Sequence, residues 1–278
     1  MEQNQSAEKT KVLFITQEIL PYIDQTIKAT ICRYLPQGIQ ERNKEIRTFM
    51  PKFGLINERR NQLHEVIRLS GMNLIIDDVD HPIIIKVASI SQVRIQIYFI
   101  DNNEYFKRKF IFRDASGTFF DDNDERSLFF CRSVLETVKK LGWAPNIVNC
   151  HGWMAAFTPL YVNKMYRDNP LFTTSKVVTT LYEDDFQEKM SDTLYKKLKY
   201  DGLKDDDMAA AFKTADYITL MKSAIDNSDA IIFAEKNVNP ILTSYVKSKN
   251  LPYISYNRYD IDYLSETTDA FFDEIIEY

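Results

Sequence analysis

The chain has 278 residues, of which 45% are hydrophobic and 13% aromatic, so it carries enough apolar side chain to bury a core. Its formal net charge is −5, and acidic and basic residues are mixed along the chain without a one-sided basic field. We therefore expect a folded globular protein that binds neither nucleic acid nor membrane.

The polar N-terminus and the cysteines indicate the cellular compartment of the protein. Residues 1–10 are polar, which predicts a disordered N-terminal tail without a signal peptide, and no later run approaches the roughly 20 apolar residues that span a bilayer. Cys32, Cys131 and Cys150 are odd in number and form no close pair, which favours reduced, buried thiols over disulfides or zinc ligands. The sequence predicts a cytoplasmic protein without a metal.

Glycine is scarce, with 7 residues in 278, and the glycines are isolated from one another. Loops that cradle a dinucleotide or a phosphate use clustered glycines, because the backbone must approach the phosphate closely. We therefore predict no such loop and no cofactor.

In chain order, short β-rich apolar runs are followed by helical patterns. The strand and helix pairs are 11–16 with 25–42, 146–150 with 153–167, and 230–234 with 238–249. This alternation implies right-handed crossovers between parallel strands. We predict an α/β fold, with a single Rossmann-like domain and a mostly parallel sheet over residues 11–258.

Two further segments extend this plan. The β-branched runs 82–88 and 93–100 are separated by four residues, which predicts a β-hairpin that extends the sheet in antiparallel fashion. Residues 124–141 carry apolar side chains at helical spacing, and Gly142 is suited to end that helix.

The remaining segments are polar or acidic. We expect a loop with helical turns over 183–207, in which Asp205, Asp206 and Asp207 cap a following helix over 208–212 rather than bind a metal. Residues 259–278 are acidic and aromatic, and form a tail, a docked terminal helix or a partner-binding face.

Motifs recur in a fixed order along the chain. They are Glu18-Ile19-Leu20-Pro21 with Leu35-Pro36 downstream, then Asp122-Asn123-Asp124-Glu125-Arg126, Leu141-Gly142-Trp143-Ala144-Pro145-Asn146 and Asn149-Cys150-His151-Gly152-Trp153, and finally the segment 222–240. They resemble the E-x-x-P, D-N-x-x-R, L-G-W-x-P-D and H-x-H-D-W motifs of the first domain of bacterial glycogen and starch synthases.

The resemblance implies one Rossmann domain of the two-Rossmann (GT-B) class of retaining glycosyltransferases, which extend an α-1,4-glucan from ADP-glucose. It covers most of the chain and stops near the family's interdomain linker, so we expect the N-terminal half only. The second domain would supply the cations that hold the leaving diphosphate, and without them the transfer barrier is not lowered.

The sequence departs from the family at the loop K-x-G-G-L, whose lysine and glycines meet the donor's pyrophosphate. Asp24 stands at the lysine position, and Thr26 and Ile27 stand at the two glycines. A carboxylate repels phosphate, and β-branched residues block the close approach that glycine permits. Binding of ADP-glucose in the family's mode is therefore disfavoured.

Two polar motifs of the family also lack some of their polar residues in this sequence. In H-x-H-D-W, Asn149 replaces the first histidine and Gly152 replaces the aspartate. A T-I-H-N-like segment appears as Thr179-Thr180-Leu181-Tyr182, without its histidine and asparagine.

His151 holds the family's sugar-site position, at the carboxyl end of a predicted strand where open α/β sheets bind ligands. It is either a sugar contact or a structural histidine with satisfied hydrogen bonds. The other candidate glucan contacts are Glu18, Tyr22, Asn123, Arg126, Trp153 and Tyr182. Helix capping by Asn123 or Asp124, a local ion pair of Arg126 and core packing of the aromatic rings are the alternatives. No residue is assigned as catalytic.

The sequence leaves three hypotheses. The chain is a glucan synthase half, inactive alone, that works with a separate donor-binding chain; or it is a non-catalytic module that binds glycogen or maltooligosaccharide; or it is a scaffold that self-associates over its exposed domain face.

Overall fold

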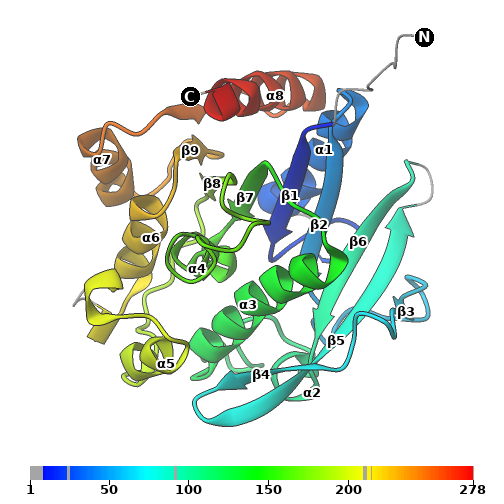
Figure 1. The fold of residues 1–278 in the computed structure, drawn as a ribbon, viewed down its shortest axis with the longest axis vertical. Coiled ribbons are helices and arrows are strands. Elements are labelled where there is room, and N and C mark those ends of the chain that lie inside the picture. Colours follow the sequence, from blue (N-terminus) through cyan, green and yellow to red (C-terminus); the bar gives the residue numbers. More distant parts are fainter. Residues whose placement is uncertain (1–8, 24–25, 91–92, 209–211, 214, 278) are drawn as a thin grey trace.

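The computed structural model describes residues 9–23, 26–90, 93–208, 212–213 and 215–277, and within them a ten-stranded mixed sheet runs through the protein (Figure 1). Its strands are β1 (Lys11–Thr16), β2 (Glu45–Pro51), β3 (His64–Glu65), β4 (Met72–Ile76), β5 (Val79–Ile90), β6 (Ile95–Asp101), β7 (Ile147–His151), β8 (Lys176–Leu181), β9 (Ala230–Phe233) and β10 (Tyr253–Ser255). The order is β10-β9-β8-β7-β1-β2-β6-β5-β3, with β4 paired to β5. The predicted α/β fold with a mostly parallel sheet is confirmed.

The central strands are parallel and buried on both sides. β7 and β9 are buried along their whole length, as near-continuous apolar runs in parallel sheets generally are. The part from β10 to β6 is parallel, whereas β5 pairs antiparallel with β6, β3 and β4. The predicted antiparallel hairpin is therefore confirmed as β5 and β6.

Helices cover both faces of the sheet (Figure 1). They are α1 (Ile27–Glu41), α2 (Asn103–Phe106), α3 (Asn123–Leu141), α4 (Phe157–Lys164), α5 (Leu194–Tyr200), α6 (Tyr217–Asp226), α7 (Pro240–Ser248) and α8 (Ile261–Glu277), with 3-10 turns η1 (Trp153–Ala155) and η2 (Asp205–Asp207). The predicted helix over 124–141 is confirmed as α3, and Gly142 ends it in the left-handed conformation at φ 61°.

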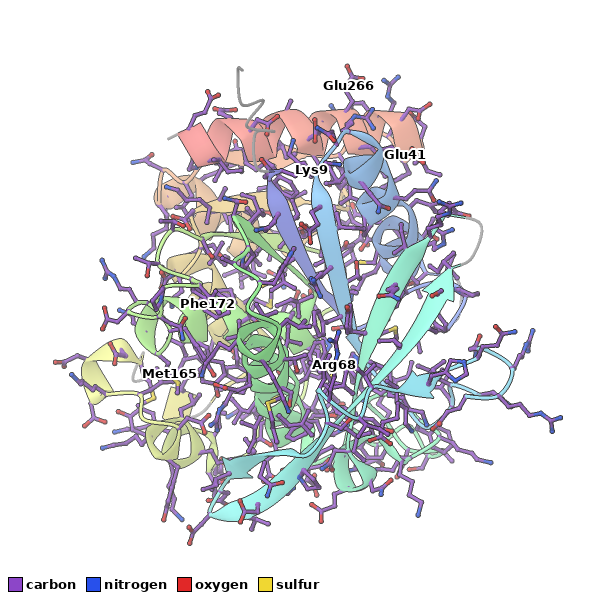
Figure 2. The ribbon with its side chains drawn as sticks, turned by 45° about the vertical axis from the view of Figure 1, so that its right-hand side comes forward. Lys9, Glu41, Arg68, Met165, Phe172 and Glu266 are labelled. Carbon is purple, nitrogen blue, oxygen red and sulfur yellow. The ribbon has the colours of Figure 1, made fainter. Side chains whose placement is uncertain are left out.

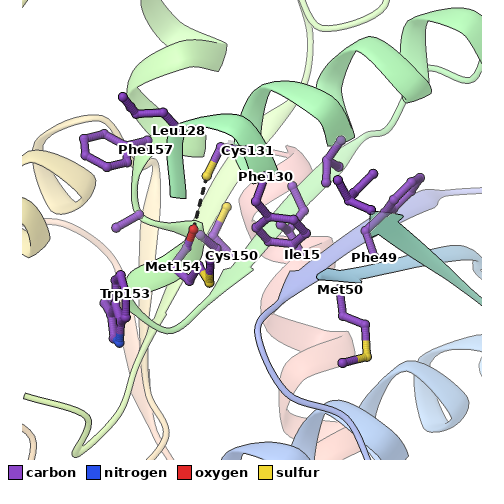
Figure 3. Packing of buried hydrophobic residues seen from close by; sticks show 14 of the residues in the cluster. Ile15, Phe49, Met50, Leu128, Phe130, Cys131, Cys150, Trp153, Met154 and Phe157 are labelled. Atoms are coloured by element: carbon purple, nitrogen blue, oxygen red, sulfur yellow. Dashed lines mark hydrogen bonds between the residues drawn. The ribbon is translucent and has the colours of Figure 1, made fainter. Parts of the chain in front are cut away.

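Alternation along the strands divides the core into two layers. Val12 and Phe14 on β1 pack with the apolar faces of α1 and α8, whereas Leu13 and Ile15 belong to the larger cluster under α3, α4 and α6. In the close view of that larger cluster, Cys131 of α3 donates a hydrogen bond to the Met154 carbonyl at 3.3 Å (Figure 3). The central strand β1 is thus packed against apolar side chains on both of its faces.

The terminal helix α8 lies against α1, and Figure 2 places Glu266 of α8 and Glu41 at the end of α1 on the same side of the molecule. Gly38 of α1 allows this close approach, because a Cβ there would lie 1.8 Å from the Ser265 Oγ of α8. The acidic, aromatic segment therefore includes a docked helix.

Two local predictions need correction. The helix expected over 153–167 is divided into η1 and α4 and ends at Lys164. The Asp205–Asp207 triplet itself forms the turn η2, and Met208 is extended (φ −113°, ψ 133°), so the triplet does not lead directly into a helix. Residues 209–211 of the expected helix lie outside the described residues.

Candidate functional site

The candidate site lies at the carboxyl ends of β1, β7 and β8. The register pairs Thr16 with His151 and His151 with Thr180, so three loops leave the sheet side by side. They carry Gln17 and Glu18, Gly152 and Trp153, and the segment 182–185. The start of α1 approaches the same edge, as open α/β folds arrange their ligand sites.

His151 is completely buried and both of its ring nitrogens are hydrogen-bonded. The Asn149 amide nitrogen donates to the Val178 carbonyl and the Thr180 hydroxyl, so its oxygen is the group that faces His151 Nε2 at 2.6 Å. The imidazole therefore carries its proton on Nε2, and Nδ1 accepts from the Tyr182 hydroxyl at 2.7 Å. Burial, with a smaller effect of Lys28, lowers the pKa of His151 to about 3.

This arrangement decides what His151 can do in the present structure. A neutral imidazole whose two nitrogens are both occupied has no donor or acceptor left for a sugar hydroxyl. The geometry matches the structural alternative for His151, and a sugar contact there stays a prediction that requires the network with Asn149 and Tyr182 to open.

Lys28 is the central charge of the site. Its ammonium lies 2.5 Å from Asp184 Oδ2 and 3.8 Å from Glu18 Oε1, and 5.1 Å from the centre of the Tyr182 ring. The other Asp184 oxygen accepts from the Tyr217 hydroxyl at 2.8 Å. Burial disfavours the charged amine, but the carboxylates outweigh it, so the pKa of Lys28 is raised and the amine stays an ammonium.

Side chains of the protein itself cap the N-terminus of α1. Thr26 is the N-cap, its hydroxyl accepts from the Ala29 N–H at 2.9 Å and donates to Glu18 Oε2 at 2.7 Å. Ile27 follows and is 44% exposed. The carboxylate of Glu18 therefore stands beside the helix N-terminus, where an anionic ligand would otherwise be favoured. Asp24, at the family's lysine position, lies outside the described residues.

Gly152 marks the tightest point of the site. Its φ is +77°, and a Cβ built there would lie 2.9 Å from both Gln17 Oε1 and Lys28 Nζ and 3.0 Å from Asp184 Oδ2. Residue 152 is the position at which the family motif carries aspartate. In this chain the space of that side chain is filled by the Lys28 cluster, which we define as Gln17, Glu18, Lys28 and Asp184.

The aromatic candidate residues are buried by packing rather than exposed to solvent. Trp153 is 3% exposed and lies in a ring cluster with Phe112, Phe119 and Phe186, while Tyr182 is fully buried over His151. Tyr22 packs edge-on against Phe99 but also lines a surface groove. Of these three aromatic candidates, Tyr22 is the one that lines this surface groove.

Asn123 and Arg126 lie in another part of the fold, where α3 begins. Asn123 donates to the Phe112 carbonyl at 2.9 Å and accepts from Arg126, whose Nε donates to the Tyr105 carbonyl at 2.9 Å. Both side chains are fully buried. The N-cap of α3 is Asp122, not Asn123 or Asp124, and Arg126 bonds an amide and a carbonyl rather than a carboxylate.

Sequence reasoning missed the Lys28 cluster. A lysine in the second position of an apolar helix, immediately after the degenerate glycine positions, was the available signal. Its partner Asp184 lies between two other acidic residues, Glu183 and Asp185, in a polar segment. In the structure these three diverge: Glu183 accepts from the Asn237 N–H at 2.9 Å, and Asp185 accepts from Asn239 at 2.5 Å.

None of the described helices is long and apolar enough to cross a bilayer. Among the described residues, no group of three or more histidine, cysteine, aspartate or glutamate side chains is arranged to hold a metal ion.

Comparison with known proteins agrees with the motifs. The sequence profile of the starch synthase catalytic domain matches residues 11–250. The chain is 32% identical over 227 residues to the glycogen synthase of Chlorobium luteolum, covering 81% of this chain and 46% of that protein. It is 33% identical over 219 residues to the glycogen synthase of Chlorobaculum tepidum, covering 75% and 45%.

The fold agrees as well. The structure superposes on the catalytic domain of starch synthase IV from Arabidopsis thaliana, solved with ADP and acarbose, with a TM-score of 0.73 over 89% of this chain and 51% of that one, at 16% identity. The chain spans about half the length of the curated relatives it matches. With the fold, the ordered motifs and the match over 11–250 in agreement, the chain belongs to the starch synthase catalytic domain family.

Proposed function

We propose that this chain is an acceptor-side domain that binds α-glucan and does not transfer glucose by itself. The observation that supports the lack of transfer is the Lys28 cluster. One ammonium is held by the carboxylates of Asp184 and Glu18 in the space beside Gly152. Lys28, in the first turn of α1, is therefore already ion-paired with carboxylates of the protein itself.

The charge of the cluster opposes a nucleotide sugar. One ammonium between two carboxylates leaves a net negative charge, and Thr26 already caps α1. A diphosphate entering there would meet Glu18 rather than free N–H groups and a free cation. Autonomous transfer from ADP-glucose is therefore disfavoured, because developing charge on a leaving diphosphate needs preorganised cations.

A surface groove beside the site suits a glucan. The groove has a volume of about 530 Å³, and its lining combines aromatic, amide and guanidinium groups: Leu20, Pro21, Tyr22, Arg33, Tyr34, Arg60, Asn61, Gln62, Ser89 and Ile90. The guanidinium of Arg33 lies 4.8 Å from the centre of the Tyr34 ring. Aromatic faces flanked by hydrogen-bonding side chains provide apolar and polar contacts together, as a sugar ring requires.

Titration calorimetry with maltoheptaose tests this proposal. We expect measurable binding to the chain, about tenfold weaker for Tyr34→Ala, because a lost aromatic contact costs on the order of 1 kcal/mol or more. Tyr200→Ala removes a tyrosine that is 53% exposed and does not line the groove, and serves as the matched control. Absence of binding, or equal loss in both variants, contradicts a glucan site in this groove.

One observation favours a second candidate, a synthase half completed by another protein. A mostly apolar groove of about 360 Å³ adjoins the start of α1 and includes the half-exposed Ile27, Tyr259 and Ile261. Such a groove suits a protein partner, either a separate donor-binding chain or a second copy. Sedimentation of the purified chain as a monomer at high concentration would exclude self-association, and failure of added donor-binding domains to confer transfer would exclude the other partner.

We also place the protein in the cytoplasm. Cys32, Cys131 and Cys150 are all buried and unpaired, which agrees with a reducing compartment. Detection of the endogenous chain in a secreted or periplasmic fraction would contradict this placement.

A further inference from the structure

The second feature of interest lies at the amino end of the sheet, at the edge opposite the Lys28 cluster. β2 begins at Glu45 and β6 at Ile95, but their pairing begins only at Thr48 with Ile97. The two strands therefore separate at this end, as Figure 1 shows. Two cavities of about 410 and 520 Å³ open there, and they adjoin because both are lined by Arg47, Gln96 and Tyr98.

The lining of these cavities is strongly basic in a chain whose net charge is −5. It brings together Arg47, Arg68, Arg94 and Lys140, from four separate segments, and one carboxylate, that of Glu45. Four cations against one carboxylate leave three positive charges in excess. Glu45 is moreover engaged, since its Oε1 accepts from the Trp143 indole N–H at 2.6 Å and lies 3.9 Å from Arg47 Nη2.

Within the basic lining, the side chain of Arg47 is held in position by neighbouring aromatic residues. Its guanidinium lies between two aromatic rings, 5.0 Å from the centre of Trp143 and 5.9 Å from that of Tyr98, and Nη1 donates to the Tyr98 hydroxyl at 3.1 Å. Its Nε is buried and finds no acceptor among the described residues. A held guanidinium with an unsatisfied donor is suited to a phosphate, and a small shift would let ligand oxygens reach it.

The other cations are available. Arg68 and Arg94 are exposed and form no ion pair within the part of the chain that the structure describes, and Lys140 reaches only the Ser70 carbonyl, at 3.4 Å. Charge of one sign that lines a concave surface attracts anions more strongly than the same charge spread over a flat one.

Neutral polar groups complete the lining. Gln40, Ser89 and Gln96 offer amide and hydroxyl groups next to the cations. Cavities of this volume are in the range that small ligands occupy. Together the excess positive charge, the held guanidinium and the neutral donors select an anion that also carries hydroxyl groups.

We propose that the cavity between the amino ends of β2 and β6 binds a small phosphorylated sugar, with its phosphate on Arg47, Arg68 and Arg94 and its hydroxyls on the neutral side chains. This site does not depend on the proposed glucan binding, because it uses none of the groove's cations and shares only Ser89 with the groove's lining.

Titration calorimetry at low salt tests the site, with ribose 5-phosphate as the probe and ribose and inorganic phosphate as the matched halves of that molecule. We expect ribose 5-phosphate to bind more tightly than either half. The double variant R68Q/R94Q should bind at least about tenfold more weakly, since two charge-assisted contacts are removed. Both residues are exposed, so the variant should fold, which its melting temperature checks.

Arg167→Gln is the control, because Arg167 is exposed and lies outside both cavities. No heat with ribose 5-phosphate, or an equal loss in the control, overturns the site. Binding of inorganic phosphate as tight as that of ribose 5-phosphate overturns its assignment to a sugar phosphate.

Discussion

At the scale of single residues, Lys28 links three segments that are far apart in sequence. Its ammonium joins Asp184 after β8 to Glu18 after β1, and all three side chains are largely buried. A buried ion pair contributes little relative to an apolar pair of the same shape, but removing one partner leaves uncompensated buried charge. The cluster is therefore sensitive to the loss of its one cation.

Lys28→Met should lower the free energy of unfolding by about 3–5 kcal/mol, because the facing carboxylates then lose their only close cation in the cluster. Lys109→Met, at an exposed position, should change it by less than about 0.5 kcal/mol. Urea unfolding at neutral pH measures both. A Lys28 variant as stable as the control would show that the ion pair is not formed.

His151 predicts a dependence of stability on pH. Its pKa is lowered from 6.5 to about 3 by burial, so between these values the unfolded chain binds a proton that the native state refuses. The wild type should lose stability relative to His151→Gln as pH falls from 6.5 towards 3, by about 1.4 kcal/mol per pH unit.

The comparison with His151→Gln also removes a competing effect. Burial raises the pKa of Asp201 to about 6, so this residue alone favours the native state as pH falls through 6. Its contribution is the same in both proteins and cancels in the difference. His64→Gln, which removes an imidazole on the exposed strand β3, is the matched control. A difference between wild type and His151→Gln that does not vary with pH would contradict the buried neutral histidine.

At the scale of elements, the packing of α8 on α1 depends on Gly38. A Cβ at this position would lie 1.8 Å from Ser265 Oγ and 2.4 Å from Ser265 Cβ, so Gly38→Ala forces the helices apart. We expect a loss of about 1–3 kcal/mol and faster proteolytic release of α8. Adding Ser265→Gly to the Gly38→Ala chain should restore most of the lost stability. Additive losses in this double-mutant cycle would show that the two residues do not meet.

The elements show what the sequence could and could not predict. The strand over 11–16, the hairpin β5–β6 and the helix α3 follow from apolar runs, β-branched alternation and the Gly142 stop, all of which are local signals. β3 has two residues and β10 three, too few for a period to show, and neither was predicted. Helix α4 begins late because η1 takes the first residues after Gly152.

The candidate site was harder to predict than the fold. Its position at the ends of β1, β7 and β8 follows from the motifs and from parallel topology. The pairing of Lys28 with Asp184 joins residues 156 positions apart, and no local pattern encodes that choice. The burial of Tyr182 over His151 is likewise a tertiary contact that replaces solvent or ligand with protein.

At the scale of the whole molecule, the Lys28 cluster and the basic cavity lie at opposite edges of one sheet. The carboxyl edge carries the Lys28 cluster and the amino edge carries the basic cavity. The groove proposed for glucan extends from the loop after β1 to Ser89, which lines both the groove and the cavity. The chain spans about half the length of the curated relatives, and the apolar groove beside α1 lies on the same side as the Lys28 cluster. Any partner that supplies a donor site would have to displace or complement that cluster.

The measurement that tests this account most directly is titration calorimetry of ADP-glucose with the purified chain, run beside transfer of labelled glucose from ADP-glucose to glycogen. We predict no heat of binding and no transfer, because Lys28 is committed to Asp184 and Glu18 and α1 is capped by Thr26. Binding of ADP-glucose with transfer of glucose by the chain alone would contradict the account and show that a donor site forms despite the Lys28 cluster.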